Sequence, residues 1–566
     1  MKKIWQKHHL KIISLGLFLL AATLRLPKLN SLPAGFFPDE AALAYNGWSI
    51  WRTSRDEWGQ QLPLTMRSFD DDKPALYAYL TIPFVLLDGL THAAARYPAA
   101  LAGSILPTLV FWLAVQVKQK RLGLLAALVI IITPWHWEVA RTAIEAGVAL
   151  TFSVGALVAF KSKWSYGWWV GLALSLLTIF TYHTARLILP WLLILTALLL
   201  IKRKKRRKLV VIFGGLLFAF GLTLSLTASS ERFAQISIFN DRGALALRQE
   251  AIREDGVAQI PIWMTRMFHN KPLSWLQTFS HSYLKQNSLI YLFWGGAQPP
   301  RVEIPETGQF LLVLLPFFIL GLVKAVRRQQ NFDWWLLAWL LLAPLPASLT
   351  SAEIPHTYRT LFMLIPVALL IAQGLETSLG WVWHQLGLKG VVIISSVISA
   401  LVLANTAKAW HQYAIHQQLN KPWHRQYGYQ ELYQILSQYQ PEQDHKVYIT
   451  QTEKEPYIYA LYYNQVPPEV YQAQPEKRLA HKAIEAGEAS WQLFNYVFTE
   501  DACPYDYGAQ RNQDLYVVNK TCTPPAGFKR RCKISFQDDS AMFFIDSPTG
   551  DRIEGEEVID TLKCEN

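Results

Sequence analysis

Two adjacent carboxylates, Asp39 and Glu40, follow an apolar segment in the stretch Phe37-Pro38-Asp39-Glu40. Carboxylates near a membrane boundary can act as a general base, bind a metal ion or anchor a cation, because a lowered dielectric raises their pKa toward a useful range. The same pair also suits the start of a helix, with Asp39 as the N-cap and Glu40 in the first turn. The spacing alone leaves both interpretations open.

The second group of candidates consists of cations beside apolar segments. Short outer loops of membrane proteins are normally poor in Lys and Arg, yet three such loops predicted in this chain each carry one arginine. The cations of this group are Lys73, Arg141, His183, Arg186, His356 and Arg359. Since an arginine can meet a phosphate bidentately, these residues predict a phosphate or pyrophosphate ligand. For any single arginine, contact with lipid headgroups is the alternative.

Glu145 follows Arg141 by four residues and is the third acidic candidate. The two side chains share one face if a single helix continues through both positions. An ion pair that orders the loop and a catalytic role are both open interpretations of this spacing. Glu138, one turn earlier, is a less favoured candidate.

The composition indicates what must position these residues. Charged residues make up 17% of the 566 residues and the set AVILMFWYC makes up 51%, whereas soluble domains have about 25% charged residues. The chain is therefore predicted to be a membrane protein with a soluble part attached. Its net charge of +12 does not indicate nucleic-acid binding, because the basic residues cluster beside apolar segments, as they do in cytoplasmic loops.

About eleven apolar segments are long enough to cross ~30 Å of hydrocarbon. They are residues 10–26, 97–117, 121–137, 143–160, 164–182, 186–201, 209–226, 308–323, 333–350, 359–375 and 390–407. The lysines near the N-terminus predict that this end is cytoplasmic, and eleven crossings then place the C-terminus outside. The first segment also resembles a signal peptide, whose cleavage would not change the side of the later loops.

The apolar stretch 74–87 is too short for a clear span. If it crossed the membrane, the basic loops 118–121, 161–163, 202–208 and 324–328 would all move outside, against the positive-inside rule. We therefore predict a juxtamembrane or re-entrant helix that lies at the outer interface.

The chain is predicted to have two parts. Residues 1–407 form a membrane module with long outer loops at 27–96 and 227–308, and residues 408–566 form a soluble extracytoplasmic domain. The tail is long enough for one core, and its short apolar runs between Pro and Gly turns predict an α/β or α+β fold.

Within the tail, helices are predicted at 429–439 and 456–463, and strands at 446–450 and 515–518. All four cysteines of the chain lie here: Cys503, Cys522, Cys532 and Cys564. An even number in a segment predicted to lie outside indicates two disulfides, and the sequence does not separate the three possible pairings.

Taken together, these features resemble the GT-C glycosyltransferases that use polyprenyl-phosphate sugars, especially the protein mannosyltransferase and aminoarabinose transferase branch called family 39. The resemblance covers residues 1–407 and rests on order and topology. The matching residues are Pro38-Asp39-Glu40 with Tyr45, Lys73-Pro74, Arg96-Tyr97-Pro98, Arg141 with Glu145, Gly308 to Gly321, and Pro355-His356 with Arg359 and Pro366. The family typically has Asp where this chain has Glu145.

The resemblance implies an integral-membrane hexosyl- or pentosyltransferase of the plasma membrane. It would move a sugar from a polyprenyl-phosphate carrier to a protein, glycan or lipid acceptor on the extracytoplasmic face. Asp39 would be the general base, with Glu40 and Glu145 as further catalytic candidates. The residues implied to bind the lipid phosphate are Lys73, Arg96, Arg141, His183, Arg186, His356 and Arg359. If Mg²⁺ or Mn²⁺ takes part, the three carboxylates would be its ligands.

Two other classes of function compete with this interpretation. A transporter or flippase of lipid-linked saccharides would also need buried cations, but it predicts inverted repeats and charges in the middle of spans, which the sequence does not show. A membrane-anchored binding module would make the tail the working part, and the long outer loops argue against it.

Overall fold

The computed structural model describes residues 2–69, 71–227, 236–420, 422–438, 445–450, 456–474, 490–508, 514–536 and 538–549. The chain divides into two compact units. The first unit comprises Met1–Leu29, Leu64–Tyr77 and Arg96–Gln417, and the second comprises Asn30–Pro63, Ala78–Ala95 and Gln418–Asn566. Most of the first predicted outer loop thus belongs to the same unit as the tail, and the predicted division at residue 407 stays a prediction.

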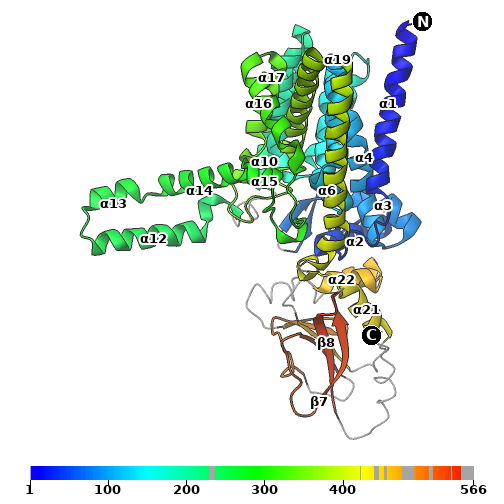
Figure 1. Cartoon of the computed structure of the whole chain (residues 1–566). Coiled ribbons are helices and arrows are strands. Elements are labelled where there is room, and N and C mark those ends of the chain that lie inside the picture. The colour runs from blue at the N-terminus through cyan, green and yellow to red at the C-terminus, as the bar shows by residue number, and fades with distance from the viewer. Residues whose placement is uncertain are drawn as a thin grey trace. The chain divides into compact units, whose positions relative to one another are not determined.

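The first unit is a helical bundle with one small β-hairpin (Figure 1). Its main helices are α1 (Lys2–Arg25), most of α4 (His92–Gln116), α5 (Lys120–Ile132), α6 (Pro134–Arg141), α7 (Glu145–Lys161), α8 (Gly167–Ile179), α9 (His183–Leu200), α10 (Lys204–Thr227), α12 (Arg242–Val257), α13 (Ile262–Phe268), α14 (Lys271–Gln286), α15 (Leu289–Phe293), α16 (Leu315–Arg328), α17 (Asn331–Leu342), α18 (Leu345–Ser348) and α19 (Leu364–His411). The hairpin pairs β1 (Thr65–Ser68) with β2 (Asp71–Pro74). Short 3-10 turns lie at η1 (Ile238–Asn240), η2 (Pro300–Val302), η3 (Leu312–Leu314) and η4 (Leu361–Met363).

The described part of the chain contains four helices that are long and apolar enough to cross a membrane, or five if the bent pair α5 and α6 forms one span. The predicted spans 97–117, 186–201 and 209–226 correspond to α4, α9 and α10. The predicted span 121–137 is bent by 63° between α5 and α6. The total of eleven spans and the side of each loop stay predictions.

The predicted spans 359–375 and 390–407 fall largely within α19, which begins at Leu364. Two helical segments meet there at a single break, and their separate crossing of a membrane stays a prediction. That break is Gly387, whose φ of 62° and ψ of −158° lie outside the helical region and suit a residue without a side chain.

Close packing of α16 against α19 depends on two glycines. A Cβ atom on Gly321 would lie 1.9 Å from the carbonyl oxygen of Leu370, and one on Gly374 would lie 1.8 Å from that of Phe317. Small residues let helix backbones approach in membrane bundles, where van der Waals packing drives association. The two positions therefore fix how closely these helices can pack.

Within the predicted outer loop 227–308, residues Arg242–Val257 form α12. Together with α13 and α14 it makes an arm that projects sideways from the bundle of α10, α16 and α17 (Figure 1, green). The arm is more exposed than the bundle, since none of the side chains of α13 is buried.

The second unit contains the tail domain and α2, whose first turn holds the predicted catalytic pair. Its helices are α2 (Pro38–Thr53), most of α3 (Leu76–Asp88), α21 (Tyr429–Gln438), α22 (Pro456–Tyr463) and α23 (Pro468–Gln472), with the short turns α20 (Gln417–Leu419) and η6 (Pro422–Arg425) before them in the tail. α3 confirms the helix predicted for the stretch 74–87, and its position at an outer interface stays a prediction.

The tail forms a six-stranded mixed sheet in the order β4-β5-β3-β6-β8-β7. The strands are β3 (Val447–Thr450), β4 (Ser490–Leu493), β5 (Tyr496–Thr499), β6 (Leu515–Asn519), β7 (Phe528–Ser535) and β8 (Ala541–Pro548). β3 pairs in parallel with both β5 and β6, and all residues of β3 and β5 are buried, as expected for strands covered on both faces. The predicted module of apolar helices followed by an α/β or α+β domain is confirmed.

Cys503 and Cys522 form a disulfide. Cys532 is disulfide-bonded as well, and Cys564 lies outside the described residues. The Cys503 to Cys522 bond settles one pairing that the sequence left open.

Candidate functional site

The predicted catalytic pair lies at the start of α2. Phe37 is the N-cap residue, Pro38 takes the first helical position and Glu40 the third. Glu40 Oε1 accepts a hydrogen bond from the backbone N–H of Phe37 at 3.2 Å, as the third residue of a capping box does. The helix-start interpretation is therefore half right: Glu40 stabilises the start of the helix, but Asp39 is not its N-cap.

Asp39 is half-buried in the first turn of α2, where the positive end of the helix dipole stabilises a carboxylate. The phenol of Tyr459 lies close to this turn. Burial, followed by the neighbouring rings of Tyr463 and Tyr429 and the charges of Glu40 and Asp39, raises the pKa of Tyr459 well above its usual value. Tyr459 therefore stays protonated at neutral pH and can donate a hydrogen bond.

Two further carboxylates, Asp56 and Glu57, are fully buried after the end of α2. Asp56 Oδ1 accepts hydrogen bonds from the backbone N–H groups of Trp58 and Gln60 at 3.0 and 2.8 Å. Glu57 Oε1 accepts one from the Trp58 indole at 3.1 Å. The sequence analysis missed both residues, and these bonds show that they order the turn after α2.

In the first unit, Arg359 belongs to a group of charged side chains that also includes Arg301, Glu353 and His356, called the Arg359 group below. Arg301, His356 and Arg359 all act electrostatically on Glu353. Arg359 Nη1 donates to Thr350 Oγ1 at 2.9 Å and to a backbone carbonyl at 3.0 Å, which fixes the guanidinium. The sequence analysis predicted His356 and Arg359 and missed Arg301 and Glu353.

The hydrogen bonds of His356 fix its tautomer. Its Nδ1 accepts from the backbone N–H groups of Tyr358 and Arg359 at 3.2 and 3.4 Å, so the proton of the neutral ring is on Nε2, which lies 3.4 Å from Glu353 Oε2. Burial, and then the charge of Arg359, lowers the pKa of His356 to about 3. Its ring is therefore neutral at pH 7.

Glu353 is ionised in the same group. Burial acts to raise the pKa of Glu353, but the hydrogen bond from His356 and the charges of Arg301 and Arg359 lower it to about 2. At neutral pH the Arg359 group thus contains two guanidinium cations, one carboxylate and a neutral imidazole. Its net charge is positive, which suits an anionic ligand.

Tyr182, which precedes α9, connects Glu145 to the Arg359 group. Its hydroxyl interacts electrostatically with both Arg359 and Glu145. Glu145 is half-buried and is the first residue of α7, whereas Arg141 is the last residue of α6, and the backbone between these helices is extended. The predicted shared helical face of Arg141 and Glu145 is therefore wrong, because the helix does not continue through both.

Lys73, His183 and Arg186 form a second cationic group, called the Lys73 group below. Lys73 is nearly buried on β2 and donates to Ser68 Oγ at 3.3 Å. His183 Nε2 lies 2.9 Å from the Asp72 carbonyl oxygen, which can only accept, so this nitrogen carries a proton. Lys73 and Arg186 both act electrostatically on His183. Residues that the sequence predicted from separate loops are thus close together.

Arg96 and Arg141 bind backbone carbonyl groups in the last turn of α1 and in the segment that follows it. Arg96 Nη1 donates to Leu29 at 2.8 Å, and Arg141 donates to Leu24 and Pro27 at 2.9 and 2.7 Å. The last carbonyls of a helix lack intrahelical partners, so both arginines hold the exit of α1 in place. Their binding to a lipid phosphate stays a prediction.

The three predicted metal ligands do not form one described cluster. One oxygen of Glu40 already accepts the helix-start hydrogen bond. Over the part of the chain that the structure describes, no group of three His, Cys, Asp or Glu side chains could hold a metal ion. We derive no step through a metal.

No protein-family model and no curated protein sequence matches the chain. Among solved structures, it is similar to the oligosaccharyltransferase of Archaeoglobus fulgidus tethered with an acceptor peptide, with a TM-score of 0.49 and 12% identity over 82% of this chain; the chain spans 64% of that protein's length. It is also similar to ArnT from Cupriavidus metallidurans bound to undecaprenyl phosphate, with a TM-score of 0.46 and 12% identity, covering 96% of this chain and 98% of that one.

Proposed function

We propose that this protein is an integral-membrane glycosyltransferase that moves a sugar from a polyprenyl-phosphate carrier to an acceptor on the extracytoplasmic face. The observation that carries the proposal is the Arg359 group, in which the guanidinium of Arg359 is fixed by Thr350 and Ala352 and Arg301 and Arg359 both act electrostatically on Glu353. The resemblance of the Pro38-Asp39-Glu40 stretch to lipid-phosphate-dependent transferases supports the same conclusion.

The Arg359 group would bind the phosphate of the donor. Two guanidinium groups offer planar pairs of N–H donors that match phosphate oxygens. Thr350 Oγ1 and the carbonyl oxygen of Ala352 hold the guanidinium of Arg359 in place before the ligand arrives, so little reorganisation is needed. The Lys73 group is a second candidate for the phosphate or for the pyrophosphate of a longer carrier headgroup.

The proposed reaction is a displacement at the anomeric carbon. The acceptor nucleophile loses its proton to Asp39 and forms a bond to that carbon. The bond between the anomeric carbon and the phosphate oxygen breaks, and the lipid phosphate leaves with the electron pair. Positive charge beside the leaving oxygens stabilises the negative charge that develops there.

Asp39 is the proposed base because Glu40 already serves the helix. The capping bond from Phe37 engages Glu40, whereas the helix start does not use Asp39 as its cap. A half-buried carboxylate in a first turn combines a lowered dielectric with contact to solvent and substrate.

Transport of a lipid-linked saccharide is the alternative function. A transporter is expected to place charges in the middle of its spans. Here Arg141 is the last residue of α6 and Arg186 lies in the first turn of α9, so both charges lie at helix ends. This placement favours catalysis at a membrane boundary.

The proposal is tested with the purified full-length protein in detergent. Polyprenyl phosphates that carry radiolabelled hexoses or pentoses are incubated with envelope extracts as the source of acceptor. The products are separated by chromatography, and the label that moves from the polyprenyl phosphate to a protein, a glycan or another lipid is counted. We expect transfer from at least one donor by the wild type and none by Asp39→Asn. Movement of intact lipid-linked sugar across vesicles, with no transfer, would support the transporter instead.

A further inference from the structure

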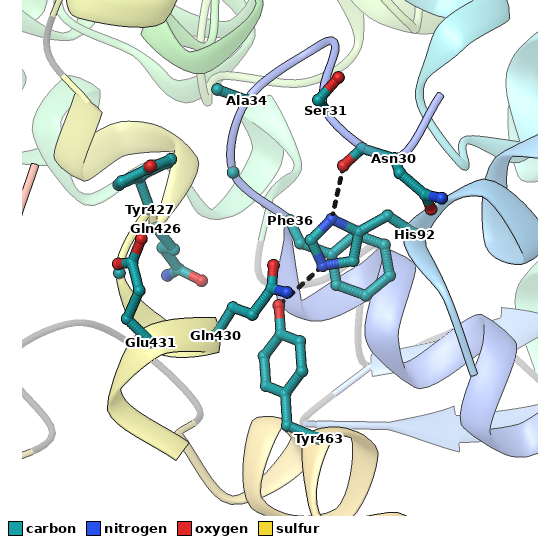
Figure 2. A pocket seen from close by; sticks show the side chains of 12 residues that line it. Asn30, Ser31, Ala34, Phe36, His92, Gln426, Tyr427, Gln430, Glu431 and Tyr463 are labelled. Atoms are coloured by element: carbon teal, nitrogen blue, oxygen red, sulfur yellow. Dashed lines mark hydrogen bonds between the residues drawn. The ribbon is translucent and has the colours of Figure 1, made fainter. Parts of the chain in front are cut away.

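A small cavity lies in the second unit (Figure 2). Some of its lining residues come shortly before the predicted base, Asp39, in the sequence. Its volume is about 170 Å³, and it is partly open to solvent. Three segments line it: residues 30–36 before α2, His92, and the tail residues 426–431 with Tyr463. Ligand pockets for drug-sized molecules usually have ~300–1,000 Å³. This cavity therefore has room for one small ring.

One wall of the cavity is aromatic and held by hydrogen bonds. His92 stacks on Phe36 with 4.1 Å between ring centroids and 12° between planes. Its Nδ1 lies 3.2 Å from the carbonyl oxygen of Asn30, which can only accept, so Nδ1 carries the proton. In the neutral ring, Nε2 then accepts from the Tyr463 hydroxyl at 2.9 Å. Both dashed bonds are visible in Figure 2.

The opposite wall is polar and contains a buried acceptor. Glu431 Oε2 is buried and has no hydrogen-bond partner among the residues that the structure describes. Burial raises the pKa of Glu431, although a hydrogen bond from Tyr427 acts in the opposite direction. Leaving a buried acceptor unsatisfied costs about 1–3 kcal/mol, so a ligand that donates a hydrogen bond here is favoured. In Figure 2 the amide of Gln430 reaches toward His92 from the same helix.

The backbone next to this wall requires a glycine. Gly428 has a φ of +102°, and a Cβ atom there would lie 2.7 Å from Met542 Sδ. The close approach brings the start of α21, and with it Gln430 and Glu431, to the edge of the cavity.

Tyr459 connects the cavity to the predicted base. Its hydroxyl lies 2.5 Å from the carbonyl oxygen of Phe36 and 2.5 Å from Gln426 Oε1, and both of these residues line the cavity. The charges of Glu40 and Asp39 act on the same phenol. A ligand in the cavity would thus sit beside the residues that surround Asp39.

The chemistry of the lining indicates the class of ligand. No lysine or arginine occurs among the described lining residues, so a phosphate is not favoured. The amides of Gln426 and Gln430 offer donors and acceptors, and Glu431 accepts from hydroxyl groups. The aromatic wall suits an apolar face. A pyranose or furanose ring presents this combination, with hydroxyl groups at its edge and C–H groups on its faces.

We propose that this cavity binds a sugar unit of the acceptor, so that the acceptor is a glycan or a glycolipid. The inference rests on the proposed transferase function and extends it by naming the acceptor class. Phe36 and His92 would pack against a face of the ring, and Glu431 and Gln430 would bind its hydroxyl groups.

The test uses the full-length protein in detergent and saturation-transfer NMR. The probes are the methyl glycosides of glucose, galactose, mannose and N-acetylglucosamine, with an acceptor-type peptide that carries Asn and Ser as the competing class. We expect at least one glycoside to bind the wild type. Glu431→Gln and Gln430→Ala should each weaken that binding at least tenfold, and Gln434→Ala, one turn further along α21 and outside the cavity, should leave it unchanged.

Asp39→Asn separates this inference from the proposed function. The variant should bind the glycoside as the wild type does and lose sugar transfer. If no glycoside binds, if the peptide alone binds, or if Glu431→Gln and Gln434→Ala bind equally, the sugar-binding inference is overturned even where transfer persists. If the wild type binds the glycoside but transfers no sugar, the result supports sugar binding in the cavity and contradicts the proposed transferase function.

Discussion

The Oε1 atom of Glu40 lies 3.2 Å from the backbone nitrogen of Phe37 and accepts its hydrogen bond. This contact distinguishes two carboxylates that are neighbours in the sequence. Glu40 is almost fully buried and serves the helix start, whereas Asp39 lies half-buried in the same turn. Glu40 therefore stabilises the helix start, and Asp39 is the carboxylate that we propose as the base.

The first prediction concerns the stability effect of these two residues. Glu40→Ala removes the acceptor for the Phe37 N–H and should lower the free energy of unfolding by about 0.5–2 kcal/mol, the range of lost helix-start bonds. Glu40→Gln keeps an acceptor oxygen and should be milder. Thermal unfolding of the detergent-solubilised protein measures both. Asp39→Asn gives up the favourable interaction of a carboxylate with the helix dipole and should lower Tm less than Glu40→Ala does. A larger loss in Asp39→Asn than in Glu40→Ala would contradict the division of roles.

The second prediction concerns carrier binding. Arg359→Ala and Arg301→Ala should each weaken binding of undecaprenyl phosphate by about 10–100-fold, since a hydrogen bond to a charged group contributes ~1.5–3 kcal/mol. Thermal stabilisation by undecaprenyl phosphate, compared with undecaprenol, reports the contribution of the phosphate. Arg253→Ala is the matched control, because Arg253 is exposed on α12 and pairs with Glu250.

If undecaprenyl phosphate and undecaprenol stabilise the wild type equally, the Arg359 group does not bind the phosphate. If Arg253→Ala weakens the binding of undecaprenyl phosphate as much as Arg359→Ala does, the effect comes from the overall charge of the protein and not from the Arg359 group.

The third prediction concerns pH. The pKa of His356 is lowered from 6.5 to about 3, so below pH 6.5 the unfolded chain binds a proton that the folded protein excludes, and stability falls as the pH drops toward 3. The pKa of Glu353 is lowered from 4.5 to about 2, so its stabilising contribution is present above pH 4.5 and is lost as the pH falls toward 2. Tm should therefore decrease between pH 6.5 and 4.

In His356→Gln the decrease in Tm should be smaller, because glutamine does not bind a proton in the unfolded chain in this pH range. His281→Gln removes an exposed histidine on α14 and should retain the wild-type slope. Parallel Tm profiles for wild type and His356→Gln would show that His356 does not titrate as described.

The fourth prediction concerns the packing of α16 on α19. Gly374→Ala places a Cβ atom 1.8 Å from the Phe317 carbonyl oxygen and should destabilise the protein by about 1–3 kcal/mol, as overpacking does. Gly380→Ala, on the same helix, meets nothing within 4 Å and should be neutral or stabilising, since alanine favours helices over glycine by ~0.5–1 kcal/mol. Equal Tm values for the two variants would contradict the close approach.

Periodic segments of the sequence predicted their structure well. The patterns at 429–439 and 456–463 became α21 and α22, and the apolar runs near 447 and 515 became the buried strands β3 and β6. These predictions depend only on local spacing. The pairing of Cys503 with Cys522 was not predictable, because it depends on which strands become neighbours.

The candidate site was predicted in part. His356 and Arg359 were noticed because an arginine in a short outer loop is unusual. Arg301 was missed because it lies in a long loop, far in sequence from Glu353, and only folding brings them together. The supposed helix through Arg141 and Glu145 ends at Arg141, a break that i to i+4 spacing does not reveal.

The central claim is that this protein transfers a sugar with Asp39 as the base, and mass spectrometry of cell-envelope glycans, glycolipids and proteins tests it most directly. A deletion strain is compared with the same strain complemented by wild type or by Asp39→Asn. The account predicts that one glycan modification disappears on deletion, returns with the wild type and stays absent with an Asp39→Asn protein that is expressed and folded. An unchanged envelope in the deletion strain, or full restoration by Asp39→Asn, would contradict it.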